Sequence, residues 1–173
     1  GRLTIDKLLV NDSADSNVIN VGVNTNNSVW GYTLVATVGS PIVGNVNHNT
    51  DLNNVDASSN VHKFNGLATN AEISDLSSMT WGYWGYSYST DNGTTWISNP
   101  TGTLGYSGLP LDNDDGGATG KTLLDSHNEG GSSIEFKVGA SSLPTQTSGD
   151  YTNTIHFYAV AKPAPEKTMQ DTT

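Results

Sequence analysis

Alternation of apolar and polar residues is the feature that most constrains the fold of this chain. It recurs in five segments: LTIDKLLV (3–10), NVINVGVNT (17–25), GYTLVATV (31–38), SIEFKV (133–138) and YTNTIHFYAVA (151–161). A period of two places alternate side chains on opposite faces of a β-strand, so one face is buried and the other contacts water. No segment longer than about ten residues keeps a helical period. The sequence therefore predicts an all-β chain of antiparallel strands.

Short runs of Asn, Asp, Ser and Gly separate these segments and are typical of tight turns. They are NDSADSN (11–17), TNNS (25–28), TDNG (90–93), SNPTG (98–102) and QTSGD (146–150). About seven to nine strands separated in this way predict a β-sandwich, formed by a single domain over residues 1–161. Residues 39–66 and 105–132 lack the alternation, and we expect long decorated loops or short extra hairpins there.

The two ends of the chain bear on whether it contacts neighbouring domains or subunits. Pro163 and Pro165 exclude normal strand pairing, so residues 162–173 are predicted to form an extended linker. The chain begins Gly-Arg without an initiator Met, and we expect it to come from a longer polypeptide. The first strand, near residues 3–10, either pairs within its own domain or is exchanged with a neighbouring one.

The net charge of the chain limits the classes of molecule that it is expected to bind. Seventeen acidic residues against seven basic ones give a formal net charge of −10, which repels nucleic acid and anionic lipid. No segment approaches the roughly 20 apolar residues of a membrane span, so direct membrane insertion is not expected. There is no cysteine, and disulfides therefore cannot stabilise the fold.

Residues 81–96, WGYWGYSYSTDNGTTW, hold three of the four tryptophans. A hairpin turning at Gly93 with Tyr88 opposite Trp96 would place Trp84, Tyr86, Tyr88 and Trp96 on one face. In one interpretation, which we favour, the rings of one face fill the core, and those of the other face form a cross-strand ladder covered by the long loops. In the other, Trp84, Tyr86 and Trp96 form a flat, solvent-facing strip that stacks on the sugars of a host or cell-surface glycan.

Residues that could support chemistry are sparse. The acidic loop LDNDDGG (111–117) is the best metal candidate, because Asp112, Asp114 and Asp115 offer the hard oxygen ligands that Ca²⁺ prefers. The alternative, which we favour, is an acidic solvated turn. The four histidines lack metal-ligand spacing, and no nucleophile motif or paired carboxylates stand out. We therefore expect neither an enzyme nor a cofactor.

Several motifs resemble those of large bacterial cell-surface and fibre proteins built from Ig-like β-sandwich modules. VINVGVNTNNSVWGYTLVATV (18–38) resembles a strand pair of these modules, SMTWGYWGYSYSTDNGTTW (78–96) their tryptophan-led hairpin, and FKVGASSLPTQTSGDYTNTIHFYAVA (136–161) their closing unit. The resemblance implies an Ig-like fold in which Tyr151 is a corner tyrosine. It also implies secretion to the bacterial surface, as one module among several in an adhesin or fimbria-like filament.

Some bacterial surface sandwiches join a lysine of the first strand to an asparagine of the last by an isopeptide bond, with an acid as catalyst. Lys7 occupies a suitable place, with Asn153 and Glu135 as conceivable partners. The alternative, which we favour, is that Lys7 extends its amine to solvent from a strand edge.

The leading functional hypothesis is a non-catalytic structural or adhesive module that contacts neighbouring copies or modules through its strand edges. The first and last strands would provide these contacts, through Leu3, Ile5, Leu9, Ile155 and Phe157. The alternative hypothesis is a carbohydrate-binding module that uses the aromatic strip.

Overall fold

The computed structural model describes residues 1–6, 11–25, 30–55, 63–126 and 130–163. Within these ranges the chain is all-β, as predicted, and its one short helical turn is a 3-10 turn at Leu76–Ser78. The strands are β1 (Ser13–Asp15), β2 (Ile19–Thr25), β3 (Tyr32–Val38), β4 (Leu52–Asn54), β5 (Lys63–Gly66), β6 (Tyr83–Ser89), β7 (Lys121–Ser126), β8 (Gly130–Ser141), β9 (Tyr151–Thr152) and β10 (Ile155–Ala161).

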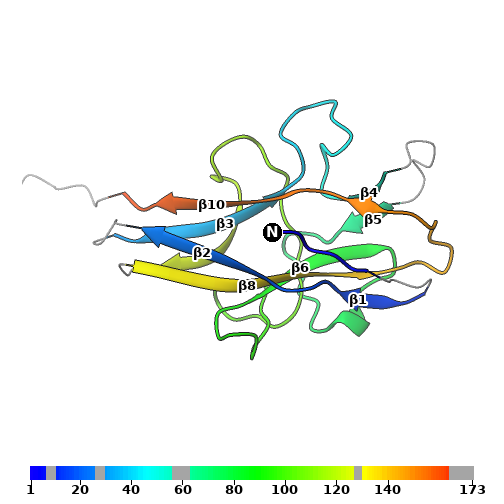
Figure 1. The fold of residues 1–173 in the computed structure, drawn as a ribbon, viewed down its shortest axis with the longest axis horizontal. Helices are drawn as coiled ribbons and strands as arrows, with labels where there is room; N and C mark the ends of the chain where they lie inside the picture. The colour runs from blue at the N-terminus through cyan, green and yellow to red at the C-terminus, as the bar shows by residue number, and fades with distance from the viewer. Residues whose placement is uncertain (7–10, 26–29, 56–62, 127–129, 164–173) are drawn as a thin grey trace, which may run out of the picture.

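The strands form two sheets (Figure 1). The larger has the order β1-β8-β6-β5-β4-β9, with β2 also paired to β8, and the smaller has the order β10-β3-β7. The described pairs are antiparallel except β5 with β6, where Asn65 and Gly66 lie parallel to Tyr83 and Trp84. The larger sheet is therefore mixed, and the prediction of uniformly antiparallel strands is wrong at this pair. The connection 67–82 is long enough to bring the chain back to the same end of the sheet.

The two sheets share one hydrophobic core. Phe136 of β8 meets Phe157 of β10 edge to face at 5.0 Å, and the Tyr88 hydroxyl of β6 donates to the Leu123 carbonyl of β7 at 2.6 Å. Alternate residues of each strand supply this core, as the period of two requires. Its buried members are Tyr32, Leu34, Ala36, Val38, Phe64, Trp84, Tyr86, Tyr88, Leu109, Leu123, Ile134, Phe136, Val138 and Ala140.

A smaller apolar cluster covers the other face of β6. Leu67, Met79 and Tyr106 are buried there, and Tyr83 of β6 packs against them. The loops that follow β5 and precede β7 supply this cover. Both faces of the aromatic strand are thus occupied, which agrees with the interpretation that one set of rings fills the core and the long loops cover the other.

Of the two stretches that lack alternation, one agrees with its sequence-based expectation and the other differs in part. Residues 52–54 and 63–66 pair as β4 and β5, which is one of the short extra hairpins expected within 39–66. Residues 121–126, expected to lie in a loop, instead form β7, and its Leu123 is fully buried. The alternation fails as a signal there because β7 pairs with β3 through a register shift between Leu34 and Val35.

The N-terminal segment is not a strand over its described residues 1–6, contrary to prediction. Leu3 and Ile5 nevertheless pack against the core. Asn17 takes the place of a pairing strand: its side chain accepts from Thr4 N at 2.7 Å and donates to Arg2 O at 3.0 Å. Its backbone N–H also donates to Thr4 O at 3.3 Å. Lys7 and Leu9 lie outside the described residues.

Candidate functional site

The outer edge of β10 is the first candidate for a site. β3 pairs with one side of β10, and no strand of the described chain pairs with the other. Two flanking bonds fix which residues face β3: Gly39 N donates to Thr154 O at 2.9 Å, and Lys162 N donates to Gly31 O at 3.1 Å. Even-numbered residues therefore bond to β3. By alternation, the backbone N–H and C=O groups that point outward are those of Ile155, Phe157, Ala159 and Ala161.

This edge lacks the usual protection against strand addition. Exposed edges commonly carry lysine, proline or a bulge that prevents another strand from pairing. The seven residues of β10 are IHFYAVA, which include no Asp, Glu, Lys, Arg or Pro. In a chain of net charge −10, a neutral edge of this length is well suited to receive another strand.

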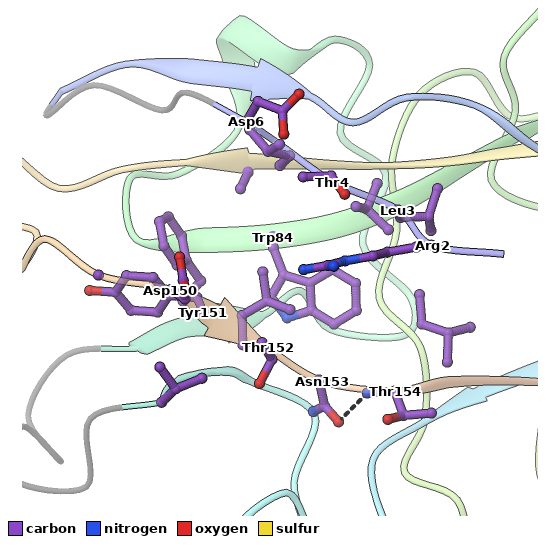
Figure 2. Close-up of a pocket in the computed structure, with 18 of the residues that line it drawn as sticks. Arg2, Leu3, Thr4, Asp6, Trp84, Asp150, Tyr151, Thr152, Asn153 and Thr154 are labelled. Atoms are coloured by element: carbon purple, nitrogen blue, oxygen red, sulfur yellow. Dashed lines mark hydrogen bonds between the residues drawn. The ribbon is translucent and has the colours of Figure 1, made fainter.

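A groove of about 930 Å³ runs beside the start of β10. Residues 1–6 form one wall, and residues 146–155 with Phe157 form the other, while Trp84, Val138 and Ala140 lie beneath it. Figure 2 shows Arg2 to Thr4 on one side, Tyr151 to Thr154 on the other, and the Trp84 indole between them. The groove has both apolar and polar lining, in keeping with its position where the core opens to solvent.

Four of the five predicted contact residues line this groove. They are Leu3 and Ile5 in one wall, and Ile155 and Phe157 in the other. Their side chains pack against the core rather than projecting to solvent, so what they offer to a neighbour is mainly their backbone. Leu9, the fifth, lies outside the described residues.

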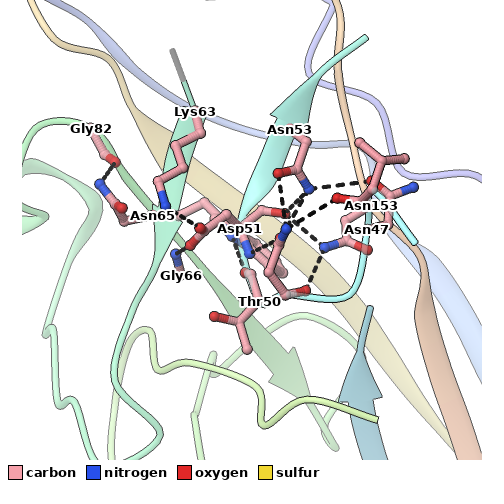
Figure 3. A network of polar contacts seen from close by, with 12 residues as sticks. Asn47, Thr50, Asp51, Asn53, Lys63, Asn65, Gly66, Gly82 and Asn153 are labelled. Carbon is pink, nitrogen blue, oxygen red and sulfur yellow. Dashed lines mark hydrogen bonds and ion pairs between the residues drawn. The ribbon is translucent and has the colours of Figure 1, made fainter. Parts of the chain in front are cut away.

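An amide clamp, formed by Asn47, Asn49, Asn53 and Asn153, fixes the wall that precedes β10 (Figure 3). Asn49 and Asn53 exchange side-chain hydrogen bonds at 3.0 and 3.2 Å, and Asn53 also donates to Asn47 at 3.3 Å. The Asn153 amide donates to the backbone carbonyls of Asn49 at 3.0 Å and Asp51 at 2.7 Å. The clamp thus joins the Asn-rich loop to the chain between β9 and β10.

Asp51 and Thr50 extend the clamp to the neighbouring strands. The Asp51 carboxylate pairs with Lys63 Nζ at 2.6 Å and accepts from Gly66 N at 3.0 Å. The Thr50 carbonyl accepts from the Trp84 indole N–H at 2.9 Å. The indole is thereby held in one orientation beneath the groove. Neither the clamp nor this bond was predicted, although the density of asparagines in 45–54 is a visible signal of local side-chain bonding.

The aromatic residues do not form a solvent-facing strip. Trp84 and Tyr86 are only 2% and 0% exposed and belong to the core, so their face supplies the core-filling set of rings that the favoured interpretation left unassigned. Tyr88 pairs with Ile97, not Trp96, because Asn92 and Gly93 both adopt positive φ and lengthen the turn. Trp96 therefore falls on the opposite face. The carbohydrate hypothesis loses the platform on which it depended.

Trp96 instead covers a partly buried ion pair. Lys137 Nζ lies 4.2 Å from the centre of the Trp96 ring and 3.0 Å from an Asp15 carboxylate oxygen. The Tyr106 hydroxyl donates to the other Asp15 oxygen at 2.6 Å. This cluster joins β1, β8 and the loops over the larger sheet. Sequence reasoning missed it because its members are far apart in the chain.

The structure does not assemble the predicted calcium site. Asp112 is buried, and one of its oxygens accepts from the Thr37 hydroxyl at 2.8 Å and the Tyr158 hydroxyl at 2.6 Å. Asp115 caps its own turn through Thr119 at 2.6 Å. Within the described ranges, no three His, Asp or Glu side chains gather in a group that could hold a metal ion. Asp112 therefore anchors the core and Asp115 its own turn, while the Asp114 backbone N–H donates to Asp112 at 2.8 Å.

The isopeptide hypothesis remains a prediction, because Lys7 lies outside the described residues. Asn153 uses its amide in the clamp. Glu135 lies in β8, where it pairs with Asn20 of β2 and Ser89 of β6. An intact mass lower than the sequence mass by one ammonia would reveal the bond.

Across the described residues, no helix is long and apolar enough to cross a bilayer. Comparison with known proteins adds no relative: no family model matches the chain, and no curated protein or solved structure matches it significantly.

Proposed function

We propose that this chain is a non-catalytic structural or adhesive module of a bacterial surface protein or extracellular fibre, which contacts neighbouring copies or modules through its strand edges. The observation that carries the proposal is the open edge of β10, seven residues long and free of acidic residues, lysine and proline. Addition of a strand to such an edge satisfies its outward backbone groups, and pockets for alternate side chains then give specificity.

The proposal includes an Ig-like sandwich as the fold. Two packed sheets with a shared core support it, and so does Tyr151, whose hydroxyl donates to the Thr147 carbonyl at 2.6 Å. A tyrosine hydroxyl bonded to the backbone a few residues upstream is the corner arrangement of Ig-like sandwiches. The bacterial surface and the extracellular location belong to the same proposal and rest on the sequence resemblance.

Measuring the self-association of the purified protein tests the proposed structural role. We expect filaments or oligomers in negative-stain images, and sedimentation that depends on concentration. Ala159→Lys places a charge on the outward edge and should abolish association. The matched control is Ala118→Lys, the same change at an exposed residue of the loop before β7, which should leave association intact. Single particles for the wild type at every concentration would contradict the proposal.

A further inference from the structure

We propose that the groove beside β10 receives an extended segment of another polypeptide, with apolar side chains at alternate positions and basic residues at its ends. The inference rests on the proposed function and names the kind of partner that the module accepts. Three features support it: the backbone edges of the two walls, the apolar floor and the charge of the rim.

Both walls present unpaired backbone groups. Asn17 bonds to Arg2 O and to Thr4 N and O, so residues 2 and 4 face Asn17 as alternate residues of an extended chain. Leu3 and Ile5 then point their backbone groups to the opposite side, toward the groove. Nothing in the described chain forms a hydrogen bond with these groups.

The facing wall is the free edge of β10. There the backbone groups of Ile155 and Phe157 point away from β3. A segment lying between the two walls can pair on both sides, like a central strand. A small apolar ligand would fill the space but leave these donors and acceptors without partners, which is costly once water is excluded.

The floor selects alternate side chains. Trp84, Val138 and Ala140 lie beneath the groove and are themselves buried. The apolar surface that the groove leaves open comes from the half-buried Leu52, Tyr151 and Ile155. In a bound strand every second side chain would point down to this apolar surface and the others would point to solvent. The volume of about 930 Å³ lies within the range of pockets that enclose ligands, roughly 300–1,000 Å³.

Charge favours a partner with basic ends. The groove lining includes Asp6 and Asp150 against a single basic residue, Arg2, and the chain as a whole carries −10. Complementary charges speed the encounter of partners and suppress the wrong ones. Acidic peptides are therefore disfavoured.

A synthetic peptide, Lys-Thr-Val-Thr-Ile-Thr-Val-Thr-Lys, provides the probe. Titration into isotopically labelled protein should shift the amide resonances of Leu3, Ile5, Ile155 and Phe157, and slow their hydrogen exchange by about tenfold or more. The same peptide with N-methylated backbone amides keeps the side chains but loses the donors, so its affinity should fall by at least about tenfold. Asp6→Lys should weaken binding by about threefold, and Glu72→Lys, the same change of charge at an exposed loop residue, should leave it unchanged.

Each outcome is decisive. Equal affinity for the N-methylated peptide, shifts confined to other regions, or no binding at millimolar peptide would overturn the inference even if the protein forms filaments. Binding to a protein that stays monomeric would support it while counting against self-assembly. Dispersal of oligomers by the peptide would also support it and identify a second copy as a source of the segment.

Discussion

Two adjacent proline substitutions in β10 should have very different effects on stability. Val160 is even-numbered, and its N–H faces Thr33 of β3 within the ladder. Val160→Pro removes this donor, places the ring against the Thr33 carbonyl and leaves that acceptor unsatisfied. A lost hydrogen bond costs about 1 kcal/mol and a buried acceptor without a partner about 1–3 kcal/mol. We therefore expect Val160→Pro to lower the free energy of unfolding by about 3 kcal/mol.

Ala159→Pro changes the preceding residue, whose N–H points outward and bonds to no described residue. The only cost of this substitution is the restriction of φ by the proline ring. The free energy of unfolding should therefore fall by less than about 1 kcal/mol. For a chain of this length, 1 kcal/mol corresponds to about 2–4 °C in Tm. Thermal unfolding should therefore show a fall of about 6–12 °C for Val160→Pro and less than about 4 °C for Ala159→Pro.

Val160→Ala is the control, because it removes the same side chain without changing the backbone. Equal destabilisation by the two prolines, or a larger effect at Ala159, would refute the assignment of the outward edge. The same alternation underlies the proposed function and the groove inference, so both would then need revision.

Three further outcomes are expected. Lys137→Met breaks the ion pair beneath Trp96 and should cost about 2 kcal/mol in urea unfolding, more than Lys63→Met, because Lys63 is far more exposed. Millimolar CaCl₂ should leave Tm unchanged, since hydroxyl donors already occupy Asp112; a clear rise would restore the calcium hypothesis. Hydrogen bonds, first from Ser89, lower the pKa of the Asp91 carboxyl from 3.8 to about 2. The ionised Asp91 therefore stabilises the fold above about pH 4, and this stabilisation is lost as the pH falls toward about 2. The stability of Asp91→Asn, measured by urea unfolding, should lack this pH dependence.

Alternation predicted the strands in which buried and exposed residues follow each other regularly along the chain. β2, β3 and β10 lie within the expected segments, and β8 contains the expected segment 133–138 but extends beyond it at both ends. Each of these strands buries one face over much of its length, and a period of two is the direct signature of such burial. It could not reveal β7, where Leu123 and Leu124 are adjacent and a register shift breaks the period. It also overpredicted a strand at residues 3–6, where Leu3 and Ile5 are apolar enough but a side chain, not a strand, supplies the pairing groups.

The candidate site was predictable in part. The sequence placed Ile155 and Phe157 on the inner face of the last strand, and the structure brings them together with Leu3 and Ile5. It could not say which edge of β10 is free, because pairing order depends on contacts between distant segments. The hairpin register failed for a local reason: Asn92 adopts positive φ beside Gly93, which shifts Trp96 to the other face.

The amide clamp has a consequence for the conditions in which this molecule keeps its shape. Asparagine side chains neither titrate nor gather counter-ions, so the bonds among Asn47, Asn49, Asn53 and Asn153 have the same strength in dilute buffer, in brine and in mild acid. The ionic contact beside them is the pair of Lys63 with Asp51. A wall held this way keeps its geometry when the ionic strength or the pH of the surrounding medium changes.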